Sequence, residues 1–586
     1  MQCPRGERGS TLLDAVVGTA LMLVVFVGIV GAFRLTVMAV SNNKARAGAI
    51  ALANERLEFI RSLPYASVGT TGGIPSGNIA QSETVNLNDV SYTRRTFISW
   101  EDDPADGSGA ADTNGVRTDY KAAKVTVSWV VRDGTHTITL ISRISPPGVE
   151  TSVPGGTLSF NVVDSRLVPV SNAQIRVVNA GVSPSVDLTT YTDAAGTAVI
   201  LGVPSGSGYR VTTTKSGYST AQTYGSSATN TNPIPAHLGV ALNQTTAATF
   251  AIDVLSDKTI ETYSPVSTGT TTESFNDASG IGSSSGVTVS GGAVRLTVGE
   301  NGFTSPGSFL TTSFSTSSLV AWKRLTWATS TPSGTSIAFR VYDSSGTNLI
   351  PDSQIPGNSA GLTVSPVSLA NVSTSTYPSL VIGATLSTSN ASNTPSVDAY
   401  SISADTGPRS LPNIGLTMTG AKTIGTTVGG AQVYKYQNSS INSGSSGSVT
   451  LSGIEWDSYT IGLAASTTYA IQSVCNPQPE TLSPNSSQTT RVFVAPFTTN
   501  SLLVDVKNAS GTPIKNANVR LYRTTPAYNT TIASDGCGNS YFSGIAAGTG
   551  TSRYSLQVSA SGYQIFNATS TINVSGTSRT SVILNN

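Results

Sequence analysis

The stretch that decides the fold is RGERGSTLLDAVVGTALMLVVFVGIVGAF, from Arg5 to Phe33. It begins with basic residues, and from Ala15 to Phe33 it carries no charge, which is about the length of an apolar helix that crosses a bilayer. An aspartate, Asp14, stands at the edge of this apolar run. A carboxylate beside lipid is costly unless a positive group meets it, so the sequence raises the question of what pairs with Asp14.

The apolar run continues into a second helical segment. After Val40 the chain has no small-residue cleavage site of the kind that ends a secretory signal peptide. Instead it is rich in alanine, and Leu52, Leu57 and Ile60 recur at helical spacing. Pro64 ends the helix, because the residue before a proline avoids the α region. We expect one helix of roughly 80 Å, apolar all round in its first half and amphipathic in its second.

The composition limits the possible classes of protein. A chain of 586 residues is too long for one core. Its formal net charge of +1, with only 11% charged residues, gives no reason to expect nucleic acid as a partner. The two histidines, His136 and His237, are too far apart in the sequence to suggest a zinc site. Abundant glycine, serine and threonine are typical of short strands and turns in a secreted β protein.

Gly9, followed by STLLD and an apolar helix, resembles the N-terminus of type IV prepilins. In that family a prepilin peptidase cuts a short basic leader after a glycine, the apolar segment is kept, and the new N-terminus is often methylated. The resemblance implies a cut between Gly9 and Ser10, with methylation of Ser10. It also implies that Asp14, at the fifth mature position, pairs with the N-terminal amine of a neighbouring subunit and so fixes subunit register.

The chain departs from the family pattern at two positions. Asp14 replaces the usual glutamate and is one methylene shorter, and Ser10 replaces the usual phenylalanine or methionine. The alternative interpretation is a plain membrane anchor, in which Asp14 is a helix N-cap or first-turn acid.

Residues 64–150 resemble the globular part of minor pilins. KVTVSWVV and HTITLISRI alternate as strands, and RDG forms the turn between them. The loop before them is acidic and does not follow the EF-hand pattern. It could bind Ca²⁺ through carboxylate oxygens or be a solvated loop, and we expect no other cofactor. Its candidate ligands are Asp102, Asp103, Asp106 and Asp112, and Asp119 follows them.

An internal repeat organises the C-terminal two-thirds of the chain. Segments starting at Leu158 and Leu502 share an opening strand, a proline turn, an Asn-Ala pair, an acidic turn with glycine, and a closing SGY. The pattern resembles carboxypeptidase-regulatory-like domains, which are Ig-like antiparallel sandwiches. We expect a third, weaker copy from Asn413 to Pro496. The matched pairs are Asn172 with Asn516, Ala173 with Ala517, Asp193 with Asp535, Gly196 with Gly538, Gly217 with Gly562 and Tyr218 with Tyr563.

A different unit, residues 256–408, lies between the copies and is expected to be a larger jelly-roll or lectin-like sandwich. Trp322 and Trp327 lie five apart, so in a strand they face opposite ways. Either one is in the core and the other stacks on a sugar, or both are core residues. Cys475 and Cys537 could form a disulfide in an oxidising compartment, but sequence spacing cannot show whether they approach.

The expected fold class is therefore mainly β, with a long N-terminal pilin helix, a small pilin sheet and a chain of antiparallel sandwiches. The expected divisions are a leader (1–9), the pilin helix (10–63), the minor-pilin-like region (64–150), and β-sandwiches at 151–255, 256–408, 409–499 and 500–586.

These features predict a non-enzymatic minor pilin of a bacterial type IV pilus-like filament, with a multi-domain stalk for adhesion. Its partners would be the prepilin peptidase, other pilin subunits, the membrane and a surface ligand such as a glycan, and not nucleic acid. It would lie in the cytoplasmic membrane before assembly and on an extracellular filament or the cell surface afterwards. The alternatives are a pseudopilin of a secretion system, a membrane-anchored surface protein outside any filament and, remotely, a glycan-active enzyme, although the middle unit has few acids for paired-carboxylate chemistry.

Overall fold

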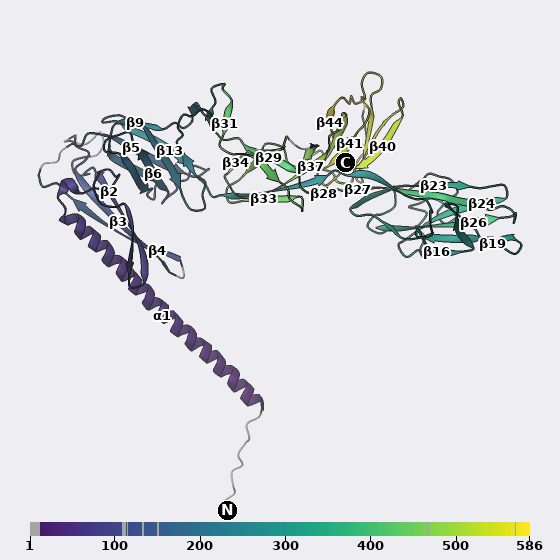
Figure 1. Ribbon diagram of the computed structural model, residues 1–586, viewed down its shortest axis with the longest axis horizontal. Coiled ribbons are helices and arrows are strands. Elements are labelled where there is room, and N and C mark those ends of the chain that lie inside the picture. The colour runs from purple at the N-terminus through teal and green to yellow at the C-terminus, as the bar shows by residue number, and fades with distance from the viewer. Residues whose placement is uncertain are drawn as a thin grey trace, which may run out of the picture.

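The computed structural model describes residues 12–107, 113, 115–131, 134–148, 152–465, 468–568 and 570–586. The chain is mainly β, as the sequence predicts, with one long helix, α1 (Leu12–Ser62), followed by a short 3₁₀ turn at Tyr65–Ser67. Figure 1 shows α1 projecting from one end of a row of β domains.

The second half of α1 packs on a four-stranded antiparallel sheet with strand order β1-β2-β3-β4. We call residues 12–148 the helix–sheet unit. Its buried helix residues recur every three or four positions and form one stripe, which is the expected amphipathic pattern. They are Ala45, Ala49, Leu52, Ala53, Leu57 and Ile60. The strands are β1 (Ser82–Leu87), β2 (Val90–Glu101), β3 (Tyr120–Val131) and β4 (Gly134–Ile144).

Small residues let the helix approach the sheet closely. The buried Tyr92 hydroxyl donates a hydrogen bond to the Ala45 carbonyl at 2.9 Å. A Cβ at Gly48 would lie 2.7 Å from the same hydroxyl, so a larger residue there would displace the Tyr92 side chain. Arg94 also ties the sheet to the helix. It donates a hydrogen bond to the Glu83 carboxylate at 2.9 Å and another to the Leu52 carbonyl at 3.2 Å.

The first sandwich and the C-terminal sandwich have the same topology, as the internal repeat predicts. In the first, sheet β10-β9-β6-β7, with β12 beside β9, faces sheet β13-β5-β8; in the second, β43-β42-β39-β40 faces β44-β38-β41. The strands of the first sandwich are β5 (Gly156–Val163), β6 (Gln174–Asn179), β7 (Val186–Tyr191), β8 (Thr197–Val203), β9 (Gly206–Thr214), β10 (Ala221–Gln222), β12 (Leu238–Val240) and β13 (Thr245–Ala251). Those of the C-terminal sandwich are β38 (Ser501–Asn508), β39 (Asn518–Arg523), β40 (Tyr528–Ala533), β41 (Asn539–Ser543), β42 (Ser555–Ser559), β43 (Phe566–Asn567) and β44 (Thr577–Leu584).

The matched residues of the repeat have structural roles. Asn172 and Asn516 take positive φ values of 54° and 60°, a conformation that asparagine tolerates better than most residues. Gly196 and Gly538 also have positive φ, and a Cβ at either would fall within 2.6 Å of a backbone carbonyl oxygen of the opening strand. The Asp193 carboxylate caps its turn by accepting the Thr197 N–H at 2.8 Å. These residues shape equivalent turns in the two sandwiches.

A further sandwich is split in the sequence. Its first strand is β14, and its remaining strands begin only after residue 408, so we call it the split sandwich. The expected opening of this copy at Asn413 and the expected place of residues 256–264 in the middle unit are both wrong, because β14 pairs with β33 and β37. The strands are β14 (Ser256–Ser264), β28 (Arg409–Ser410), β29 (Gly415–Gly420), β30 (Thr423–Thr426), β31 (Gln432–Tyr434), β32 (Gln437–Asn442), β33 (Ser448–Ile454), β34 (Asp457–Leu463), β35 (Tyr469–Val474), β36 (Glu480–Leu482) and β37 (Ser487–Pro496).

The middle sandwich is inserted between the first two strands of the split sandwich. Two sheets, one around β27 and one around β26, enclose a core centred on the fully buried Trp322. In Figure 1 this sandwich lies at the end of the row that is farthest from α1. Its strands are β15 (Ser267–Glu273), β16 (Ile281–Ser285), β17 (Val287–Ser290), β18 (Ala293–Leu296), β19 (Val298–Gly299), β20 (Gly302–Phe303), β21 (Gly307–Thr311), β22 (Phe314–Ser315), β23 (Leu319–Ser330), β24 (Thr335–Tyr342), β25 (Val367–Ser368), β26 (Ser379–Thr388) and β27 (Ser396–Thr406).

The helix–sheet unit is packed firmly against the first sandwich. Phe97 and Trp100, on β2, contact the core of that sandwich. The Gln81 side chain bridges the two units by donating to the Asp187 carbonyl at 2.6 Å and accepting the Thr189 N–H at 3.0 Å. These contacts make the junction a packed interface rather than a flexible linker.

Lys121 is buried beside this junction. Its ammonium group donates to the carbonyls of Tyr65 and Val68 at 2.8 and 2.7 Å and lies 4.8 Å from the Trp100 ring centroid. Burial lowers the pKa of Lys121 from 10.5 to about 8. The charged form is therefore less favourable in the folded protein than in the unfolded chain.

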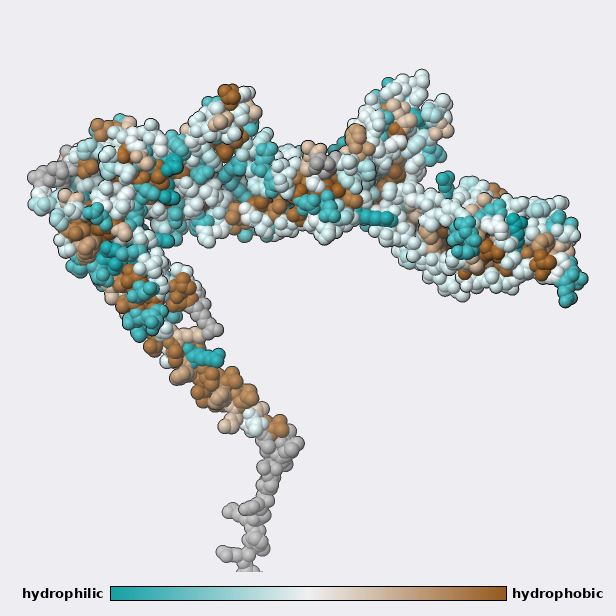
Figure 2. All heavy atoms as spheres, in the orientation of Figure 1, coloured by the Kyte–Doolittle hydropathy of each residue, from teal (hydrophilic) through white to brown (hydrophobic). Residues whose placement is uncertain are grey.

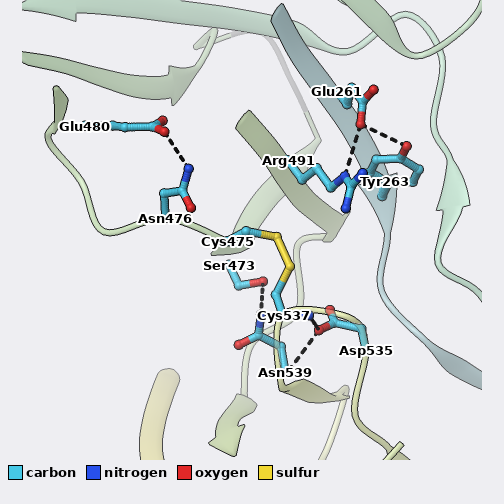
Figure 3. Close-up of a disulfide and its surroundings, with 10 residues drawn as sticks. All are labelled: Glu261, Tyr263, Ser473, Cys475, Asn476, Glu480, Arg491, Asp535, Cys537 and Asn539. Carbon is cyan, nitrogen blue, oxygen red and sulfur yellow. Dashed lines mark hydrogen bonds and ion pairs between the residues drawn. A yellow bond between two sulfur atoms is a disulfide. The ribbon is translucent and has the colours of Figure 1, made fainter. Parts of the chain in front are cut away.

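Two more junctions hold the row together. β11 (Asn232–Pro233) leaves the first sandwich and pairs with β30 of the split sandwich. A disulfide joins Cys475 of the split sandwich to Cys537 of the C-terminal sandwich, with 5.3 Å between the Cα atoms. Figure 3 shows the Asn539 side chain beside it, donating to the Ser473 hydroxyl at 3.0 Å.

We predict that the free energy of unfolding of the helix–sheet unit rises with pH from pH 8 upward. Between the folded pKa of about 8 and the unfolded pKa of 10.5, the unfolded state binds more protons at Lys121 than the folded state does. Denaturant titrations at pH 7.5, 8.5 and 9.5 should show this rise, and Lys121→Met should flatten it, because methionine does not titrate. Equal slopes in the two proteins would contradict the assignment.

We also predict that Cys537→Ser lowers the stability of the C-terminal sandwich by about 2–4 kcal/mol. The disulfide restricts the unfolded chain and ties this sandwich to its neighbour. Thermal unfolding and limited proteolysis, each with and without reductant, measure the effect, and Cys475→Ser should reproduce it because it removes the same bond. An unchanged melting temperature would show that packing alone holds the junction.

Candidate assembly surface and acidic loop

The first half of α1 has no covering layer within the described residues. Its large side chains are mostly solvent-exposed, including Leu21 (62%), Phe26 (66%) and Phe33 (69%). The helix is long and apolar enough to cross a membrane, with a mean hydropathy of 2.6 over its most apolar window. Figure 2 shows the hydrophobic colour continuing along the projecting part of the helix. An apolar surface of this extent is covered by lipid or by other protein surfaces in a working protein.

The residues of the expected leader site fall largely outside the described part of the chain. Gly9 and Ser10 precede it. Asp14 lies near the start of α1, but the position of its side chain is not described. The cut, the methylation and the pairing of Asp14 with an amine therefore stay predictions.

The acidic loop gathers three carboxylates between β2 and β3. Oxygens of Asp102, Asp106 and Asp119 lie within 4.8 Å of one another, and Asp119 is only 1% exposed. Asp103 lies outside this group, and its carboxylate faces Arg143 at 3.7 Å. Asp112 lies outside the described residues. The loop thus brings together two of the four expected ligands, and Asp119, just before β3, supplies the third carboxylate.

These carboxylates are the ligands that a hard cation prefers. Ca²⁺ takes six to eight oxygen ligands, so three carboxylates would form only part of its shell. The Asp119 carboxylate also accepts the backbone N–H of Asp103 at 2.5 Å, which ties the start of the loop to its end. The cluster has the donor chemistry for Ca²⁺, and it also serves to order the loop.

Both tryptophans of the middle sandwich belong to its core. The Trp322 indole N–H donates to the Tyr377 carbonyl at 2.9 Å, and Trp327 stacks on Phe339 with 4.3 Å between ring centroids. The interpretation in which one of them stacks on a sugar is therefore wrong. The expectation that they face opposite ways is also wrong, because a register shift between Trp322 and Arg324 brings both to the same face of β23, where the partly buried Trp327 packs against the core cluster.

The outer face of the sheet around β26 is hollowed. The depression has a volume of about 370 Å³ and lies over β16, β21, β24 and β26. Hydroxyl groups line it together with Arg340 and Tyr342, so donors, acceptors and an aromatic ring face solvent together. No residue of this hollow was predicted from the sequence, because its serines look like ordinary turn residues. The pairing of β16, β21, β24 and β26 brings them together.

Comparisons with known proteins do not assign a family. No protein-family model matches the chain, and no curated protein does. Among solved structures, the TIE protein of Bacillus anthracis aligns with 11% identity over 86% of this chain and 73% of its own, at a TM-score of 0.15. BcpA, the major pilin subunit of Bacillus cereus, aligns with 10% identity over 74% of this chain and 99% of its own, at 0.13.

The major pilin SpaA of Corynebacterium diphtheriae gives a similar result, with 12% identity over 74% of this chain and 100% of its own, at a TM-score of 0.12. Scores this low do not describe a shared overall arrangement. These likenesses therefore carry no argument about family or function.

Proposed function

We propose that this protein is a minor pilin of a bacterial type IV pilus-like filament that displays its β domains for adhesion. One observation carries the proposal: a single helix is exposed and apolar in its first half and docked on its own four-stranded sheet in its second. The docked half fixes the sheet to the helix. The free half is then available to lipid before assembly and to the helices of other subunits afterwards.

The shape of the molecule favours sparse incorporation or a tip position. In Figure 1 the row of sandwiches turns away from the axis of α1. A subunit with this much lateral mass does not repeat easily along a tightly packed shaft. The middle sandwich lies at the far end of the row, and its hollow with Arg340 and Tyr342 is the surface that we assign to ligand contact. Hydroxyl, guanidinium and aromatic groups suit a polar ligand such as a glycan.

The same helix would also serve a pseudopilin of a secretion system or a membrane-anchored surface protein that never enters a filament. The three differ in processing and assembly. A plain anchor needs no cut after Gly9, whereas a pilin and a pseudopilin both do. Incorporation into an extracellular filament then separates the pilin from the pseudopilin.

The proposed function makes a prediction about processing of the N-terminus. Mass spectrometry of the protein isolated from its native membrane should find Ser10 at the N-terminus, because the peptidase would cut after Gly9. Gly9→Ala should leave the leader attached. A Gly6→Ala variant is the matched control and should be cut normally. An intact initial methionine in the wild-type protein would rule out the prepilin assignment.

The proposed function also makes a prediction about assembly into filaments. Asp14→Ala should be cut normally but lost from sheared filaments by tenfold or more, because the amine of one subunit and the carboxylate of another would no longer compensate each other. Asp14→Glu, which keeps the charge, should restore incorporation. Immunoblots of sheared filaments and of membranes measure the distribution. Equal incorporation of Asp14→Ala would remove the pairing role and leave only an anchor.

A further inference from the structure

Lys258 is buried in the split sandwich beside a carboxylate and a carboxamide. Its side chain is 0% exposed, although it lies on β14, the strand that leads from the first sandwich toward the middle sandwich. The ammonium nitrogen lies 2.7 Å from Oε2 of Glu480 and 2.6 Å from Oε1 of Gln488. Buried lysines are rare, and one in contact with both an acid and an amide carbonyl has the components of an acyl-transfer site.

The backbone fixes the amine and the carboxamide next to each other. β14 and β37 are parallel neighbours, and Lys258 and Gln488 are direct register partners in that pairing. The Gln488 amide nitrogen donates to the Thr481 carbonyl at 3.2 Å, which turns its carbonyl oxygen toward Lys258. The reacting groups are thus held side by side by strand pairing, and such positioning is itself a large contribution to rate.

Glu480 comes from the opposite sheet and is itself well held. It lies on β36, is 7% exposed, and accepts hydrogen bonds from the Thr490 hydroxyl and from Nδ2 of Asn476. Figure 3 shows the contact between Asn476 and Glu480. Burial lowers the pKa of Lys258, and the hydrogen bond and charge of Glu480 oppose that shift. Burial thus favours the neutral, nucleophilic form of the Lys258 amine, and the Glu480 carboxylate lies within reach to take its proton.

We propose that Lys258 and Gln488 form an intramolecular amide bond, with Glu480 as the proton-transfer residue. Glu480 takes a proton from the Lys258 ammonium, and the neutral amine attacks the side-chain carbonyl carbon of Gln488. Glu480 then passes that proton to the departing amide nitrogen and takes the remaining proton from the attacking nitrogen, so that Lys258 enters a neutral amide. One C–N bond forms, one C–N bond breaks, and one ammonia leaves, so no oxidant, metal or cofactor is needed.

Gln488 is the acyl partner rather than Asn476. Its carbonyl oxygen contacts the Lys258 nitrogen directly. Asn476 instead presents its amide nitrogen to the far oxygen of Glu480, so the carboxylate lies between it and the lysine. Asn476 and Thr490 are positioning residues for Glu480.

The bond would strengthen the strand that carries load to the distal end. The chain enters and leaves the middle sandwich through β14 and β28, which pair with each other, so a pull on the middle sandwich loads β14. Without a covalent bond, only backbone hydrogen bonds and side-chain packing keep β14 in its sheet. A link from Lys258 to Gln488 would prevent β14 from sliding past β37.

Tryptic digestion of the reduced full-length protein tests the proposal. The expected product is one branched peptide that joins the segment containing Lys258 to the segment containing Gln488, lighter than their sum by one ammonia and uncut after Lys258. Lys258→Met and Gln488→Met should each abolish it. Glu480→Gln should keep the two groups adjacent but leave them unlinked, whereas Asn476→Ala should still form the branch at position 488.

Separate unmodified peptides ending at Lys258 and containing Gln488, recovered from the folded wild-type protein, would overturn the proposal. A branch at position 476 would overturn the assignment of Gln488. The wild-type measurement decides the question even if the Glu480 variant does not fold. The result is independent of filament assembly, since it requires only the folded chain.

Discussion

Parallel pairing between the first and last strands is the constraint on which the stalk depends. It recurs in the first sandwich (β5 with β13), the split sandwich (β14 with β37) and the C-terminal sandwich (β38 with β44). A parallel partner cannot be reached by a tight turn, so in each module the first and last strands are joined by all of the intervening strands. The first and last strands of each of these sandwiches therefore hold each other in the same sheet.

The same constraint explains how the middle sandwich could be inserted without disturbing its host. In the split sandwich, β14 pairs with β33 and β37. The chain can therefore leave the sheet after residue 264, form the middle sandwich and return at residue 409 without breaking these pairings. Strands β14 and β28 lie together where it leaves and returns, and their pairing closes the neck of the insertion. The insertion sends the middle sandwich outward, while the C-terminal sandwich stays beside the neck, fixed by the disulfide.

At the other end, α1 divides its surface between two kinds of environment. From Ala45 onward its buried stripe is satisfied by the sheet, with Gly48 permitting the close approach of Tyr92. Before Val40 nothing in the described part of the chain covers its apolar residues. Trp100 packs the helix–sheet unit against the first sandwich, and the pairing of β11 with β30 joins the first sandwich to the split sandwich. A helix fixed to a rigid row of domains can hold the distal sandwich at a set distance from the membrane or filament.

Local sequence alone determined the helix, the β3–β4 hairpin of the helix–sheet unit and the repeat of the first and C-terminal sandwiches. Helical periodicity, strand alternation and turn residues such as Gly196 and Gly538 act over a few positions, so a linear pattern records them. Only the tertiary structure decided that β14 belongs to the split sandwich, that Asp119 joins Asp102 and Asp106, and that Lys258 meets Gln488. The physical reason is that these contacts join residues far apart in the chain, and their geometry is set by strand register and sheet packing, which leave no periodic signal in the sequence.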